Sequence, residues 1–161
     1  EDLNLSKNCL HGSIPDAFAN SNISYLRLDN NLLTGTIAGI TKLQKLNYAC
    51  LSHNELSGAI PKEMTELSEL QWLYIDHNNL SANIPSFLGF ISELNVLDLS
   101  HNKIKGTIPE TLGELENLVN LKLEGNDLAG VVPEQICEHM RKMKNFYLSS
   151  DCERKYSLPK V

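Results

Sequence analysis

One short phrase recurs along this chain at an almost constant interval, and that interval constrains the fold more than any other feature. The phrase is a Leu-x-Leu run followed by an asparagine. The asparagines lie 23, 23, 24, 24 and 24 residues apart, at Asn8, Asn31, Asn54, Asn78, Asn102 and Asn126. A degenerate copy near the end carries Asp151 in the asparagine place. Repeats of this length indicate a solenoid, in which each copy buries its apolar face against its neighbours.

Each part of the phrase has a physical task. In the copy from Leu97 to Pro109, the alternation of Leu97 and Leu99 around Asp98 predicts a short strand with one buried face. Neighbouring copies would stack these strands into a parallel sheet. The asparagine follows where the chain turns inward, and its amide offers both donors and an acceptor to buried backbone groups. We therefore expect the six asparagines to form a structural ladder and not a ligand site.

The second half of the phrase, Gly-x-Ile-Pro, predicts the return path of the chain. Glycine permits a sterically restricted backbone conformation and proline stiffens the exit. The outer segments, such as residues 110–116, are expected to form short helical or 3₁₀ turns. Because these segments are bulkier than strands, the stack should bend with its sheet on the inside. The residues concerned are Gly12, Gly35, Gly58, Gly106 and Gly130, and Pro15, Pro61, Pro85, Pro109 and Pro133.

From Leu3 to about Pro133 the phrase Leu-x-x-Leu-x-Leu-x-x-Asn-x-Leu-x-Gly-x-Ile-Pro resembles the plant-type class of leucine-rich repeats. That class includes receptor-kinase ectodomains and polygalacturonase-inhibiting proteins. The resemblance implies an α/β solenoid, a curved right-handed superhelix with a concave parallel β-sheet and short 3₁₀ or helical outer segments. It also implies binding of a protein or peptide along the concave or lateral surface.

The chain divides into about six repeats over residues 1–136, the first incomplete, a capping repeat over 137–152 and a tail over 153–161. The cap is predicted to hold a basic helix from Glu138 to Asn145 and a Cys137–Cys152 disulfide. The alternative is two reduced, buried thiols. Plant-type receptors begin with a cysteine-bearing cap, whereas this chain begins inside a strand. We therefore expect it to be a fragment of a longer protein, or part of a larger complex.

The remaining cysteines and the sequons bear on the setting of the protein. Cys9 and Cys50 lie two repeats apart at unlike phases, so a bond between them is geometrically poor. Cys50 is expected to point outward from the sheet as a free thiol, with a link to a partner as the alternative. Together with the predicted disulfide, three sequons favour a secreted or extracellular glycoprotein. They begin at Asn4, Asn22 and Asn79.

The residues between the buried leucines predict what the concave face displays. An aromatic cluster stands out, since aromatic side chains on an open face are enriched in interfaces. The alternative is that these rings pack on one another and cover the sheet. Histidines also recur at the same position of three consecutive repeats, which suggests either solvated rings or pH-dependent binding of a partner. The predicted partner-binding residues are Tyr25, Tyr48, Trp72, Tyr74, Asp76, His53, His77, Asp98 and His101.

Other functions are disfavoured. The net charge of −6 argues against nucleic acid, and no apolar run is long enough for membrane insertion. No catalytic motif is present, so we expect neither an enzyme nor a cofactor. Asp76 beside His77 is the one place where metal ligands come near, and no metal is expected. Asp98 and Lys122 should form an exposed pair. The alternatives to a recognition module are inhibition of a cell-wall-degrading enzyme and a structural or surface-coat element, including an ice-binding surface.

Overall fold

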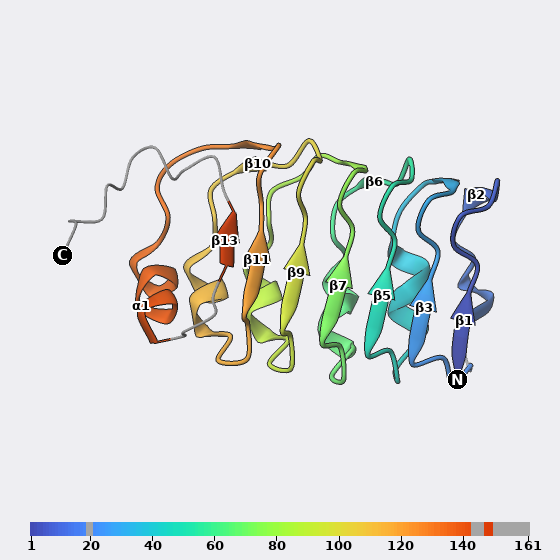
Figure 1. Ribbon diagram of the computed structural model, residues 1–161, viewed down its shortest axis with the longest axis horizontal. Coiled ribbons are helices and arrows are strands. Elements are labelled where there is room, and N and C mark those ends of the chain that lie inside the picture. The colour runs from blue at the N-terminus through green and yellow to red at the C-terminus, as the bar shows by residue number, and fades with distance from the viewer. Residues whose placement is uncertain (19–20, 143–146, 150–161) are drawn as a thin grey trace.

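The fold is a curved solenoid built on one parallel sheet, which confirms the predicted architecture. The computed structural model describes residues 1–18, 21–142 and 147–149. Seven strands pair in parallel and in chain order, so each turn adds one strand beside the previous one (Figure 1). They are β1 (Asp2–Asn4), β3 (Tyr25–Arg27), β5 (Tyr48–Cys50), β7 (Trp72–Tyr74), β9 (Val96–Asp98), β11 (Asn120–Lys122) and β13 (Tyr147–Ser149).

The leucines of the repeat form a single continuous core behind this sheet. The middle residue of each strand from β3 to β11 is buried, and so is the apolar residue two positions later. In β7 these residues are Leu73 and Ile75. Each buried aliphatic side chain contributes roughly 1.5–3 kcal/mol by leaving water, so the stack is held together mainly by this column.

The asparagine column joins each turn to the one before it. The Nδ2 of Asn54 donates hydrogen bonds of 3.0 Å to the carbonyl oxygens of Leu51, in its own turn, and of Leu28, in the preceding turn. Its Oδ1 accepts a 3.0 Å hydrogen bond from the backbone N–H of Leu33. The same pattern recurs at Asn31, Asn78, Asn102 and Asn126. Asn8, in the first turn, is exposed and donates only within its own turn.

Short 3₁₀ helices cover the core on the side opposite the sheet (Figure 1). They follow the Ile-Pro part of the phrase in most copies, where proline fixes an extended residue before the helix. The predicted outer turn near residues 110–116 is thus confirmed. The five are η1 (Asp16–Phe18), η2 (Ala38–Lys42), η3 (Lys62–Glu66), η4 (Ser86–Phe90) and η5 (Glu110–Glu114).

Within the described residues there is one α-helix, α1 (Glu134–Lys142), and it packs against η5. The predicted helix was to begin at Glu138, so its start was wrong by four residues. The helix begins directly after Pro133, a favoured arrangement because proline lacks the N–H that a first helical turn leaves unpaired. His139, a residue of the predicted basic helix, is buried, and its Nε2 lies 2.8 Å from the carbonyl oxygen of Leu118.

A second set of strands was not predicted. Three two-stranded parallel pairs form along one edge of the solenoid, where the Leu-x-Gly segments of consecutive turns meet. At Gly106, in the third pair, φ is +80°, a conformation that side chains with a Cβ rarely adopt. The pairs are β2 (His11–Ser13) with β4 (Leu32–Thr34), β6 (Ser57–Gly58) with β8 (Asn79–Leu80), and β10 (Lys105–Gly106) with β12 (Asp127–Leu128).

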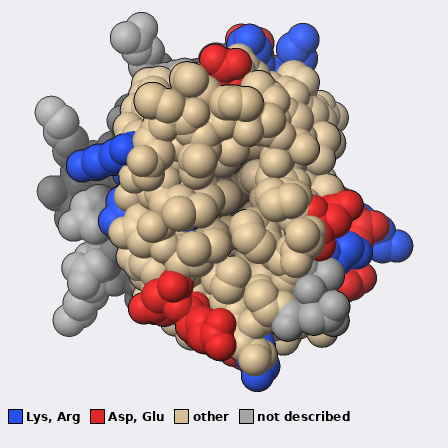
Figure 2. Space-filling view, turned by 90° about the vertical axis from the view of Figure 1, so that its right-hand side faces the viewer, with Lys and Arg blue, Asp and Glu red and all other residues tan. Residues whose placement is uncertain are grey.

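The end of the stack formed by the first turn is largely uncharged, with charged side chains at its rim (Figure 2). Leu5 and Leu10 of that turn are among the exposed large apolar residues of the described chain. No helix within residues 1–18, 21–142 and 147–149 is both long and apolar enough to cross a membrane.

Candidate functional site

The outward positions of strands β3, β5 and β7 bring four aromatic rings together, and we call them the aromatic patch: Tyr25, Tyr48, Trp72 and Tyr74. The strand register aligns Tyr25 with Tyr48 and Tyr48 with Trp72. Tyr25 and Tyr48 stack with ring centroids 4.3 Å apart. The ring centroid of Tyr48 also lies 6.4 Å from that of Trp72 and 5.7 Å from that of Tyr74. All four rings remain partly exposed, so the patch both covers the sheet and faces solvent.

Packing within the patch changes the acidity of its members. Burial, supported by neighbouring groups that carry negative charge when ionised, raises the pKa of Tyr48 far above its ordinary value of 10.0. Burial likewise raises the pKa of Tyr74 and that of the thiol of Cys50, which shares β5 with Tyr48 and is aligned with Tyr74 of β7. All three groups therefore stay protonated in the native protein at a pH where the unfolded chain begins to lose its protons.

This difference predicts alkaline destabilisation that depends on the patch. A group whose pKa is higher in the native protein than in the unfolded chain stabilises the fold. This contribution is fully present below the unfolded-state pKa and is lost as the pH rises from there to the native pKa. The free energy of unfolding should thus fall above the ordinary pKa values of 9.0 for a thiol and 10.0 for a phenol. The decline should be shallower in Tyr48→Phe, which has no proton to lose. Urea unfolding measured by circular dichroism between neutral and alkaline pH checks this, and equal slopes in the two proteins would contradict it.

Cys50 corrects one expectation about the concave face. Its side chain does occupy an outward strand position, but it is only 8% exposed because the surrounding side chains cover it. Its Sγ lies 3.7 Å from the Oγ of Ser52. The thiol is free but sheltered, so it is poorly placed for a link to a partner. Cys9, in contrast, is exposed and also free.

Two ion pairs flank the aromatic patch. Arg27 binds Asp29 through two hydrogen bonds of 3.0 and 3.2 Å. Burial opposes ionisation of Asp29, but its hydrogen bonds with Arg27 and Asn30 prevail and lower the pKa of Asp29. Lys122 lies 3.0 Å from Asp98, and this contact raises the pKa of Lys122.

The environment of Asp98 differs from the one expected for an exposed pair. Its side chain is 5% exposed, and its Oδ1 accepts a 2.6 Å hydrogen bond from the Oγ of Ser100. Lys122 and Ser100 therefore hold Asp98 within the surface. Asp98 was predicted to contact a partner, and it is in fact largely hidden from one.

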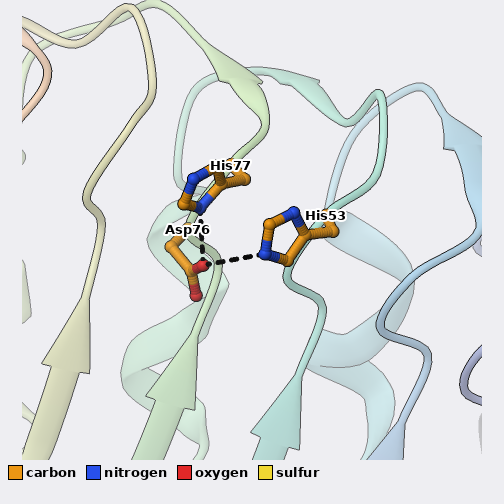
Figure 3. Close-up of side chains that lie close together, drawn as sticks. All are labelled: His53, Asp76 and His77. Carbon is orange, nitrogen blue, oxygen red and sulfur yellow. Dashed lines mark hydrogen bonds and ion pairs between the residues drawn. The ribbon is translucent and has the colours of Figure 1, made fainter.

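The histidines at one phase of the repeat form a continuous stack. The ring centroids of His53 and His77 are 4.1 Å apart, and those of His77 and His101 are 4.3 Å apart. Asp76 lies beneath the first two rings: its Oδ2 is 2.9 Å from Nδ1 of His77 and 3.9 Å from Nε2 of His53 (Figure 3). The Oγ of Ser52 donates a short hydrogen bond to the other carboxylate oxygen, Oδ1.

The backbone at this phase carries a feature that the sequence analysis missed. His53, His77 and His101 all have φ between +51° and +55°, the left-handed region, and Asn30 shares it at +57°. Gly125 occupies the same phase with φ of +68°. The sequence does contain a signal for this conformation: an asparagine and a glycine stand at the equivalent positions of other repeats, and both residues tolerate a left-handed backbone. The turn thus fixes the direction in which each imidazole leaves the backbone.

The predicted sequon asparagines and Cys137 differ in their exposure. The sequon asparagine Asn22 is exposed, as is Asn4, whose Oδ1 accepts hydrogen bonds from the N–H and hydroxyl of Ser6. Asn79 is half-buried in β8. Cys137 is partly buried against the core, while Cys152, its predicted disulfide partner, lies outside the described residues.

The sequence matches two models of the family described as Leucine rich repeat, one over residues 21–80 and 85–128 and the other over residues 1–21. The receptor-like protein CLAVATA2 of Arabidopsis thaliana is 48% identical over 59 residues, which cover 36% of this chain and 8% of that protein. The chain therefore spans less than a tenth of this curated relative.

Solved structures resemble almost the whole chain. One is the ectodomain of the membrane receptor kinase GASSHO1/SCHENGEN3 from Arabidopsis thaliana in complex with CASPARIAN STRIP INTEGRITY FACTOR 2. It is 36% identical with a TM-score of 0.83, and the match covers 92% of this chain and 18% of that one. Another is the plant peptide hormone receptor RGFR1 in complex with RGF2, 35% identical with a TM-score of 0.86 over 92% of this chain and 24% of that one.

Proposed function

Because the chain belongs to the leucine-rich-repeat family, we propose that it is a recognition module that holds a protein or peptide on its concave sheet. The observation that carries this proposal is the aromatic patch, in which four large rings stay partly exposed on an open face. Tyrosine and tryptophan bury much area while losing little conformational freedom, so they dominate the energy of many interfaces.

The shape of the patch favours an extended polypeptide. Its three strands lie about 4.8 Å apart, so the patch is roughly 10 Å wide, the length of about three residues of extended chain. The ion pairs Arg27–Asp29 and Lys122–Asp98 lie to either side and supply polar contacts at its rim. A typical protein interface has an apolar centre and a polar rim. The two receptor ectodomains named above, which were solved as complexes, support a peptide-class ligand.

The alternatives have weaker support. An acidic concave face would support inhibition of a wall-degrading enzyme, because it would attract a basic partner. Two of those carboxylates, Asp29 and Asp98, are paired with cations inside the face, which reduces that attraction. A coat or ice-binding surface needs one residue type repeated in register. The first residues of strands β3 to β11 are aligned in register, and they are chemically mixed: Tyr25, Tyr48, Trp72, Val96 and Asn120. A catalytic role has no motif to support it.

We further propose an extracellular setting, in which Asn22 carries a glycan and Cys137 bonds to Cys152. The exposure of Asn22 supports the first point, and the oxidising conditions that secreted proteins meet support the second. Expression through a secretory pathway should yield a glycan at Asn22 and a disulfide-linked peptide pair. Peptide mapping by mass spectrometry without reduction detects both, and free thiols at both cysteines would contradict the bond.

A selection experiment tests the recognition module itself. The protein is challenged with a displayed library of random peptides, and bound peptides are enriched over several rounds. Enriched peptides should share aromatic or apolar residues at alternate positions, since an extended chain presents every second side chain to one face. Their cross-linking sites should lie on β3, β5 and β7. Failure to enrich any sequence, or cross-links on η2 to η4 at the opposite side, would contradict the proposal.

A further inference from the structure

The carboxylate of Asp76 differs from its neighbours in lacking a lysine or arginine partner. Asp29 occupies the position after β3 that Asp76 occupies after β7, and it pairs with Arg27. Asp98, the last residue of β9, pairs with Lys122. In the described part of the chain, the ion-pair contacts of Asp76 are with imidazoles only, those of His53 and His77. A carboxylate oxygen beside two imidazole nitrogens is an arrangement that can bind a metal cation.

We propose that His53, Asp76 and His77 form a binding site for a divalent transition-metal ion of the zinc class. One ligand atom from each residue converges, and the three atoms lie within 4.8 Å of one another (Figure 3). Zinc binds imidazole nitrogen and carboxylate oxygen at about 2.0–2.2 Å, so the ligand atoms around it lie roughly 3–3.5 Å apart. Binding would require the present spacing to shorten to that value by rotation of the two exposed imidazoles.

The scaffold around the three ligands favours this use. The left-handed backbone at His53 and His77 sends both rings in the same direction from consecutive turns. The hydroxyl of Ser52 holds Oδ1 of Asp76 and leaves Oδ2 facing the rings. Such a hydrogen bond to the non-coordinating oxygen orients a carboxylate ligand and is common around metal sites.

The ligand set also predicts which ions are selected. Two nitrogens and one oxygen suit zinc, nickel and copper, whereas magnesium and calcium prefer all-oxygen sites. Three protein ligands leave at least one position of a four-coordinate ion open to solvent. Both imidazoles are about half exposed, so an ion reaches the site without any movement of the backbone. This inference goes beyond ligand recognition by the aromatic patch and does not depend on it.

Calorimetric titration with zinc chloride tests the site in tag-free protein, because a polyhistidine tag would itself bind the ion. Cys9 is exposed and is a competing ligand, so all proteins carry Cys9→Ser. The parent should bind one ion per chain, reversibly with a chelator, and should not bind magnesium. His53→Asn, His77→Asn and Asp76→Asn should each weaken binding about 10–100-fold. Asparagine is chosen for the histidines because Asn30 already occupies the equivalent left-handed position.

His101→Asn is the matched control. His101 stacks on His77 and has the same backbone conformation, but it lies outside the three-residue ligand set. Its replacement should weaken zinc binding far less than the loss of a ligand does, because His101 supplies none of the three ligand atoms. The absence of saturable binding in the parent would overturn the proposal. An equal loss in His101→Asn and His53→Asn would also overturn it, because any two stacked imidazoles would then suffice.

Discussion

Replacing Asn78 by alanine is expected to lower the free energy of unfolding by about 3–5 kcal/mol, a large part of the stability of a typical domain. The Nδ2 of Asn78 donates to the carbonyl oxygens of Leu51 and Ile75, and its Oδ1 accepts from the N–H of Leu56. Alanine would leave these backbone groups without partners in a region that water does not reach. Each buried group left unpaired costs about 1–3 kcal/mol. Urea unfolding followed by circular dichroism measures the change.

Asn95→Ala provides the control for this substitution. Asn95 has the same side chain in the same region of the stack, but its one side-chain hydrogen bond, to the carbonyl of Glu93, is exposed to solvent. Its replacement should change the free energy of unfolding by no more than about 0.5 kcal/mol. If Asn78→Ala destabilised the protein no more than Asn95→Ala, the ladder would not be the link that joins consecutive turns.

The double substitution Trp72→Ala and Tyr74→Ala is expected to weaken the binding of a selected peptide by about 100-fold or more. Both rings belong to β7 and supply the exposed aromatic area at the centre of the proposed interface. Central tryptophan and tyrosine anchors typically contribute at least about 2 kcal/mol each to binding. The fold should persist, because both side chains lie outside the leucine core. Calorimetry measures the affinity and circular dichroism checks the fold.

Phe90→Ala is the matched control for the loss of an aromatic ring. Phe90 ends η4 on the outer side of the solenoid and is 65% exposed. Removing it should leave the peptide affinity unchanged within error. Full binding by the double variant would remove the aromatic patch as the interface. An equal loss in Phe90→Ala would place the contact on the outer side.

The sequence predicted best the structural features that recur from repeat to repeat, namely the strands and the outer turns. Strand positions and outer turns recur in most copies, so errors in one copy are corrected by the others. The buried states of Cys50 and Asp98 were not predictable in this way. Their exposure depends on which side chains the neighbouring turns place beside them, and those side chains are not repeated. Lys122 covers Asp98, for example.

Two further differences arise where the local chain departs from the repeat. Helix α1 begins at Glu134 because Pro133 completes the last repeat and at the same time starts a helix, so the repeat and the helix meet without a spacer. The left-handed backbone at His53, His77 and His101 is set by the turn after each strand. Histidine is enriched in that conformation only relative to other side chains with a Cβ, so its presence did not by itself predict the conformation.

The claim that the side chains between the buried leucines meet a ligand is tested most directly by the fluorescence of Trp72, the one tryptophan of the chain. In the free protein, acrylamide should quench this half-buried ring. A saturating selected peptide should protect it and shift its emission to shorter wavelength, with the same dissociation constant that calorimetry gives. Calorimetric binding that left both the emission and the quenching of Trp72 unchanged would contradict the claim.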